Sequence, residues 1–240
     1  MVEKESKPFV ILKLDDLWNK NDVVHSGWRE VMAFLNEEKV VGTIGLIGES
    51  LEGGSEAYYQ WIKDRHREGH EIWHHGFCHC KPIIDDVEKR EFRGTSFEYQ
   101  LRQLYKTQKL AQDKLGIVLR SFGAPYNAVD EFTAFALKEI PEIKVWMYKE
   151  SAFPTDKFLL DRIPEVNIEY PVHQPDFEKF KAGYVQHSTE PVLIIQGHPR
   201  SWVEKPNRME EFKKIIRFLQ EEKVTFTTPY LFYMHHKGKS

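Results

Sequence analysis

The chain has very little cysteine: only Cys78 and Cys80 occur among its 240 residues. A disulfide between cysteines two positions apart is expected to be badly strained. We therefore predict two small, packed thiols and no disulfide framework. Sparse cysteine also favours a reducing compartment.

The sequence also lacks any apolar run long enough to span a membrane. Its first ten residues, MVEKESKPFV, are charged and have neither the apolar core nor the small-residue cleavage site of a signal peptide. We expect no membrane span and a cytoplasmic protein, with a processed secreted form as the alternative.

There is no excess of one charge. The sequence has 34 Lys and Arg against 37 Asp and Glu, which gives a net charge of -3, and the two signs are interspersed. No polyanion-binding surface is indicated, so nucleic acid is not an expected partner. The sequence does not predict an oligomeric state.

The chain has no repeat, low-complexity tract or flexible linker. With 41% hydrophobic and 13% aromatic residues it can bury a large core. A single catalytic domain over residues 1–240 is therefore predicted, a length that an α/β barrel commonly has.

Strand-like and helix-like patterns alternate along this domain. This rhythm predicts parallel strands with right-handed crossovers, in a barrel or an open doubly wound sheet. Residues 151–190, interrupted by four prolines, show no clear pattern. The predicted strands are 9–14, 40–47, 70–74, 118–122, 143–147, 192–195 and 224–227, and the predicted helices are 28–38, 55–68, 95–115, 130–139 and 208–222.

Polar groups follow four of these strands, where the active sites of such folds are found. They are suited to a metal hydrolase, and we predict that they share one site. The four groups are Asp15-Asp16, His75 with His79, Pro125-Tyr126-Asn127, and His198.

The stretch GHEIWHHGFCHC permits two incompatible metal sites. His70-Glu71-x-x-His74 matches the zinc-protease motif, which requires both histidines on one helix. Such a helix would pass through Gly69 and Gly76, each costing about 1 kcal/mol. In a strand, Glu71 points away from the face that His70 and His74 share, so the protease interpretation is disfavoured.

His75 and His79 form the second possible site. Their spacing in a loop or short helical turn can bring both imidazoles to one ion. Asp16 is the natural third ligand, which leaves coordination positions open for water and substrate. A structural zinc knuckle that adds Cys78 and Cys80 is disfavoured, because its four ligands would crowd into six residues.

Together these residues resemble the polysaccharide deacetylases of the NodB-homology group, carbohydrate esterase family 4. The resemblance runs from Leu12 to about Tyr230. Leu14-Asp15-Asp16 matches the first family motif, and the run from Gly69 to His79 matches the second. The implied fold is a distorted (β/α) barrel of about seven parallel strands.

The resemblance also implies roles. Asp15 would be the catalytic base, while Asp16, His75 and His79 would hold one divalent metal ion. Zinc is the favoured ion, with Co, Ni or Fe as alternatives. His70 and His74 fall at non-ligand positions, in the second motif.

Two later segments resemble further motifs. In the segment Arg120–Asn127 the backbone N–H of Tyr126 would help to bind the oxyanion, with Pro125 and Asn127 beside it at the substrate. His198 resembles the late histidine of the family, the proposed general acid.

The sequence departs from the family at four points, one of which is that the late Leu-x-His motif becomes Gln196-Gly197-His198. Gly123 stands where the family has an arginine that orients the base, and Asn127 replaces a glycine. The acid-plus-tryptophan motif that supports the late histidine has no evident equivalent, and spacing does not choose between Trp146 and Trp202.

The expected function is metal-dependent removal of N-acetyl or O-acetyl groups from a poly- or oligosaccharide or its precursor. The partner is then an acetylated carbohydrate. Two alternatives stay open: a catalytically silent family member that binds sugar or a protein, and a hydrolase of another ester or linear amide.

Overall fold

The computed structural model describes residues 7–18, 23–148 and 153–238. The chain forms two compact units, each assembled from separated stretches. The predicted single domain over residues 1–240 stays a prediction. The first unit comprises Met1–Asp15, His25–Thr43 and Arg162–Thr228, and the second comprises Asp16–Val24, Ile44–Asp161 and Pro229–Ser240.

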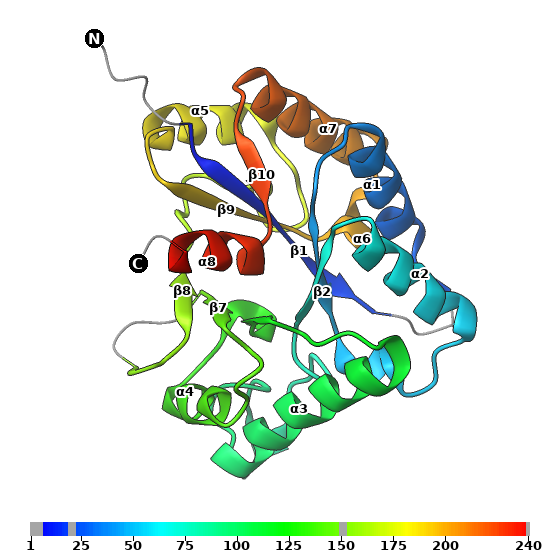
Figure 1. The fold of residues 1–240 in the computed structure, drawn as a ribbon, viewed down its shortest axis with the longest axis vertical. Coiled ribbons are helices and arrows are strands. Elements are labelled where there is room, and N and C mark those ends of the chain that lie inside the picture. The colour runs from blue at the N-terminus through cyan, green and yellow to red at the C-terminus, as the bar shows by residue number, and fades with distance from the viewer. Residues whose placement is uncertain (1–6, 19–22, 149–152, 239–240) are drawn as a thin grey trace. The chain divides into compact units, whose positions relative to one another are not determined.

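Strand β1 (Phe9–Leu17) runs through the centre of the first unit. Its apolar residues Val10, Ile11 and Leu12 are completely buried, as expected for a strand with neighbours on both sides. Strand β9 (Val192–Gly197) and strand β10 (Thr225–Thr227) both pair with it in parallel. Figure 1 shows these three strands crossing the first unit.

Four helices complete the first unit: α1 (Ser26–Glu37), α5 (Phe177–His187), α6 (Pro199–Trp202) and α7 (Pro206–Glu221). Helices α1 and α6 approach so closely that a Cβ on Gly27 would lie 2.3 Å from the carbonyl oxygen of Pro199. Between α5 and α7, the rings of Tyr184 and Phe218 meet edge to face at 5.3 Å.

The second unit contains the strands β2 (Thr43–Leu46), β3 (Glu71–His74), β6 (Ser121–Gly123), β7 (Val145–Met147) and β8 (Phe158–Leu160). Hydrogen bonds join these strands in the order β2-β3-β6-β7-β8. Strand β1 belongs to both units, because its last two residues lie in the second.

Helices of the second unit pack around an apolar core that includes Phe92, Leu104, Phe122 and Trp146. No helix among the described residues is long and apolar enough to cross a bilayer. The helical elements are η1 (Gly48–Leu51), α2 (Glu56–Arg67), α3 (Phe97–Leu110), the π-helix η2 (Ala111–Leu115), η3 (Pro125–Asn127), α4 (Glu131–Lys138) and α8 (Pro229–Lys237), and a small hairpin joins β4 (Ile83–Ile84) to β5 (Val87–Glu88).

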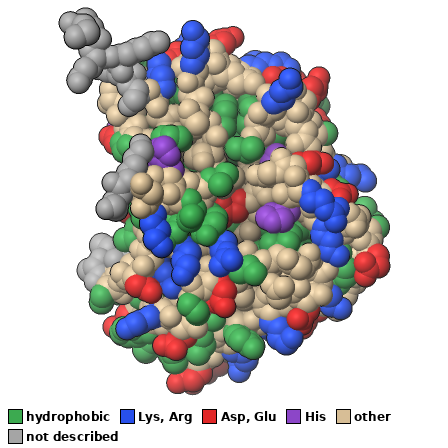
Figure 2. Space-filling view, in the orientation of Figure 1, with side chains coloured by type: hydrophobic (Ala, Val, Ile, Leu, Met, Phe, Trp, Pro, Cys, Tyr) green, Lys and Arg blue, Asp and Glu red, His purple; other side chains and the backbone are tan. Residues whose placement is uncertain are grey.

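The alternation of strands and helices is as predicted. Helix α2 begins after the cap Ser55, and the chain leaves it through Gly69 at a φ of 97°. Strand β8 and helix α5 lie in the proline-rich region 151–190, where no element was predicted; residues 151–152 are outside the described residues. Basic and acidic side chains are intermixed on the face in Figure 2.

Candidate metal centre and its neighbouring groups

The candidate metal centre is formed by Asp16, His75 and His79. Asp16 ends the regular part of β1 with a φ of 70°, and the two histidines lie in the loop after β3. That loop turns at Gly76, whose φ is 75°. A Cβ there would lie 2.7 Å from both Glu91 and Pro125, so glycine is required.

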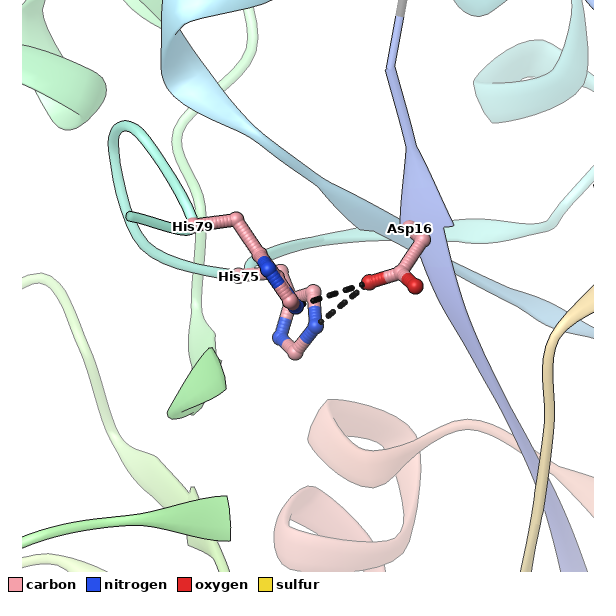
Figure 3. Close-up of side chains that lie close together, drawn as sticks. All are labelled: Asp16, His75 and His79. Atoms are coloured by element: carbon pink, nitrogen blue, oxygen red, sulfur yellow. Dashed lines mark hydrogen bonds and ion pairs between the residues drawn. The ribbon is translucent and has the colours of Figure 1, made fainter. Parts of the chain in front are cut away.

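Both imidazole rings point toward the Asp16 carboxylate (Figure 3). Its Oδ1 lies 3.1 Å from His75 Nε2 and 3.2 Å from His79 Nε2. Ligand atoms that each lie about 2.1 Å from one ion are roughly 3 to 3.5 Å apart. The two imidazoles and the carboxylate therefore fit a divalent ion with open positions, and the predicted ligand set is brought together.

A second contact fixes the tautomer of His75. Its Nδ1 donates to the backbone carbonyl oxygen of Gly123 at 2.7 Å, so the lone pair of the neutral ring is on Nε2. A histidine held in this way through its other nitrogen is the usual arrangement of a metal ligand. Gly123, which lacks the side chain of the family arginine, thus contributes through its backbone.

Glu91 organises the loop that carries His79. Its carboxylate is completely buried and accepts the backbone N–H groups of Phe77 at 2.5 Å, Cys78 at 3.3 Å and His79 at 2.8 Å. Burial raises the pKa of Glu91 to about 7, although these N–H groups favour the charged form. Glu91 was not predicted from the sequence, because a single acid in a loop forms no recognisable motif.

Electrostatics within the cluster favour its charged forms. Burial alone would raise the pKa of Asp16, but His75 and His79 outweigh it and hold the pKa well below its usual range. Burial lowers the pKa of His79, yet the adjacent Asp16 carboxylate leaves that pKa raised. The cluster therefore contains the ionised Asp16 carboxylate, which can bind a cation.

The prediction of two free thiols is wrong, because Cys78 and Cys80 form a disulfide. Between them His79 adopts a left-handed φ of 48°, which folds the chain back and brings the two Cα atoms to 5.0 Å. That separation is within the range of ordinary disulfides.

Tyr126 lies against the loop of residues 75–80, called the metal loop below because it carries His75 and His79. Its hydroxyl donates to the carbonyl oxygen of His79 at 2.9 Å, and the two rings lie 4.4 Å apart. Tyr126 and Asn127 have left-handed φ values of 60° and 51°. In this turn the backbone N–H groups of Asn127 and Ala128 donate to the carbonyl oxygens of Ala124 and Pro125, whereas the N–H of Tyr126 takes no part in these bonds. Pro125 is buried against Gly76. The site roles predicted for Pro125, Tyr126 and Asn127 stay predictions.

The zinc-protease interpretation fails on geometry. Residues Glu71–His74 form a strand, not a helix. Glu71 accepts hydrogen bonds from the Ser121 hydroxyl and from the backbone N–H of Tyr230. His74 bonds through both ring nitrogens, to the carbonyl oxygen of Leu104 and to the N–H of Gly76, each at 3.1 Å. Glu71 and His74 thus serve the fold.

His74 supports a prediction about pH. Burial lowers its pKa from 6.5 to about 4, so between these values the unfolded state binds a proton that the folded state does not. The wild-type protein should lose about 3 kcal/mol of stability as the pH falls from 6.5 to 4. The His74→Gln variant has no such loss. The difference in free energy of unfolding between the two proteins, measured by urea unfolding, should therefore become smaller as the pH falls over that range. A constant gap would contradict the prediction.

In the first unit, Asp15 is held by two buried side chains. Lys13 Nζ lies 2.7 Å from Asp15 Oδ1 and 2.6 Å from Oδ2, and Gln196 Nε2 donates to Oδ2 at 2.5 Å. Lys13 is completely buried. It places a buried cation directly beside the Asp15 carboxylate. A lysine inside an apolar strand, two residues before the acid and on the same face, was the available signal.

His198 is supported by an acid and a tryptophan. Its Nδ1 lies 2.7 Å from Glu169 Oε2, while Glu169 Oε1 accepts from Trp202 Nε1 at 2.6 Å and from the backbone N–H of His198 at 2.9 Å. Glu169 and Trp202 therefore fill the place that the sequence left open. Trp146 belongs to the core of the second unit.

The family model described as polysaccharide deacetylase matches residues 3–141. A comparison with curated proteins gave no match. Among solved structures, the Xyl-CE4 domain of a multidomain xylanase from the hindgut metagenome of Trinervitermes trinervoides is similar at a TM-score of 0.66 and 14% identity, with coverage of 97% of this chain and 92% of that domain.

Two further solved structures share the fold. One is a family 4 acetyl xylan esterase from Clostridium thermocellum with a cobalt ion, with a TM-score of 0.63, 16% identity and coverage of 92% of this chain and 87% of that one. The other is a CE4 family pseudoenzyme from Bacillus anthracis, with a TM-score of 0.61, 14% identity and coverage of 92% and 64%.

These similarities confirm the predicted fold class, a NodB-like (β/α) barrel of parallel strands with flanking helices. The family model covers more than half of the chain, and the low identities fit a divergent member. The chain belongs to the polysaccharide deacetylase family.

Proposed function

We propose that the chain is a metal-dependent hydrolase that removes N-acetyl or O-acetyl groups from a poly- or oligosaccharide or its precursor. The Asp16, His75 and His79 cluster carries the proposal, since its ligand atoms have the separation that one ion needs. Family membership supports the reaction class.

Asp16, His75 and His79 would hold the ion, with zinc favoured and Co, Ni or Fe as alternatives. The cobalt ion in the structurally similar acetyl xylan esterase is consistent with this range. When bound, such an ion supplies Lewis-acid chemistry that polarises an acyl carbonyl and makes water more acidic.

Asp15 is the proposed general base, next in the chain to the ligand Asp16. Lys13 and Gln196 restrict its carboxylate to one orientation, so no rotamer search precedes proton transfer. Asp15 takes the proton from the attacking water as the bond to the acyl carbon forms.

His198 is the proposed general acid. Its Nδ1–H is held by Glu169, which leaves Nε2 to deliver a proton to the departing amine or alcohol. Glu169 also stabilises the imidazolium form in the same way that a buried carboxylate supports a catalytic histidine. The backbone N–H of Tyr126 would stabilise the oxyanion, an effect worth about 3 kcal/mol for one well-placed donor.

The test compares wild-type protein with a His75→Ala, His79→Ala double variant. Wild type should contain one divalent ion per chain and release acetate from a panel of N-acetylated and O-acetylated oligosaccharides. The variant should lose both properties, because only one proposed ligand is left. A matched control, His66→Ala with His187→Ala, removes two other imidazoles and should change neither.

Each contrary result has a distinct meaning. A metal ion held by the double variant as tightly as by wild type would overturn the assigned ligands. Metal bound normally without acetate release from any member of the panel would favour the catalytically silent alternative; a CE4 family pseudoenzyme from Bacillus anthracis shares the fold.

A further inference from the structure

A second group of metal-ligating side chains lies in the first unit. Glu169, His173 and His198 each offer one ligand atom, and these atoms lie within 4.8 Å of one another. The group has the donor set of the candidate metal centre: two imidazoles and one carboxylate. None of its members is among the ligands assigned above.

A tight turn places His173 beside Glu169. The N–H of Tyr170 donates to the carbonyl oxygen of Gln174 at 2.8 Å, and His173 has a left-handed φ of 72° within this turn. Its own backbone N–H donates to Glu169 Oε2 at 2.8 Å. The turn therefore anchors the backbone of His173 directly on the carboxylate.

His198 approaches the same carboxylate from β9. The rings of His173 and His198 lie 4.7 Å apart, edge to face. Glu169 is only 4% exposed, and its other oxygen is held by Trp202 and by the backbone of His198. The carboxylate is thus oriented in advance, as supporting hydrogen bonds orient metal ligands.

We propose that Glu169, His173 and His198 form a second, weaker site for a divalent ion such as Zn²⁺. The His173 side chain is exposed, so binding an ion must order its ring. The cost of ordering it makes this site weaker than the Asp16 cluster. The ion displaces the proton between His198 and Glu169, which is released to solvent.

Occupation of this site has a functional consequence, which rests on the proposed function. A histidine bound to a metal ion through the nitrogen that carried its proton can no longer form the imidazolium that protonates the leaving group. Excess Zn²⁺ should therefore inhibit turnover while the catalytic ion stays in place.

Binding is tested without any assay of turnover. In the His75→Ala, His79→Ala background, calorimetric titration with Zn²⁺ should show one remaining site. Adding His173→Ala should weaken the affinity of that site for Zn²⁺ at least tenfold. Adding His235→Ala and His236→Ala, which removes two consecutive histidines of α8, should leave the affinity unchanged. Absence of the site from the background variant, or its loss only with the α8 pair, would overturn the proposal.

The second arm measures inhibition. His173→Ala should keep its basal acetate release, and half-inhibition should require at least tenfold more Zn²⁺ than in wild type. Equal sensitivity of the two proteins would overturn the inhibitory role. If no substrate is turned over at all, the proposed function fails, but the calorimetric result still decides whether the site exists.

Discussion

Asp15→Asn should reduce acetate release by about 10²- to 10⁴-fold, the range that a positioned general base contributes. The amide has nearly the shape of the carboxylate but cannot accept the proton of the attacking water. Metal content should stay at the wild-type level, because Asp15 is not among the proposed ligands. Turnover and metal content are measured on the same purified protein.

A loss of turnover must be separated from a loss of fold, since the variant leaves Lys13 buried without its counter-charge. The double variant Lys13→Met, Asp15→Asn removes both charges, so it should regain stability and stay inactive. Asp86→Asn makes the same chemical change in an exposed turn and should be fully active. Wild-type turnover in folded Asp15→Asn protein would eliminate Asp15 as the base.

Lys13→Met should lower the free energy of unfolding by about 3 to 5 kcal/mol, the usual cost of breaking a buried ion pair. Both side chains are almost completely buried, so water cannot replace the lost cation. Asp15 would lose its bonds from Lys13 and keep the one from Gln196. Urea unfolding at neutral pH measures the change, with acetate release recorded in parallel.

The matched control is Lys109→Met, which breaks the exposed pair with Asp113 and should lower the free energy of unfolding far less than Lys13→Met does. Lys13→Arg keeps the charge and should retain more turnover than Lys13→Met if the cation orients the base. If Lys13→Met and Lys109→Met lowered the free energy of unfolding equally, the buried pair would stabilise the protein no more than an exposed pair does.

Local chemistry explains what the sequence predicted well. The buried strand before Asp15 and the helix predicted over residues 55–68 are each encoded by local sequence. The ligand set could be predicted because Asp16, His75 and His79 follow strand ends, which gather at one edge of a parallel sheet.

What the sequence could not predict depends on distant contacts. Glu169 reaches His198 and Trp202 from a proline-rich segment without periodicity, and Glu91 reaches the metal loop across 12 to 14 residues. The disulfide depends on the left-handed turn at His79, a backbone choice that the flanking residues do not reveal. Such contacts are properties of the packed chain.

The dependence of the metal loop on Glu91 limits how the site could be transplanted. A peptide copied from residues 69–80 alone would carry both histidines but not the carboxylate that gathers three successive N–H groups. The shortest segment that could be transplanted must therefore extend through residue 91. The recipient protein must also supply a carbonyl oxygen to accept the hydrogen bond that His75 now donates to Gly123. A graft of the histidine motif without these partners would contain both histidines, but nothing would hold their loop in the conformation that brings the two rings together.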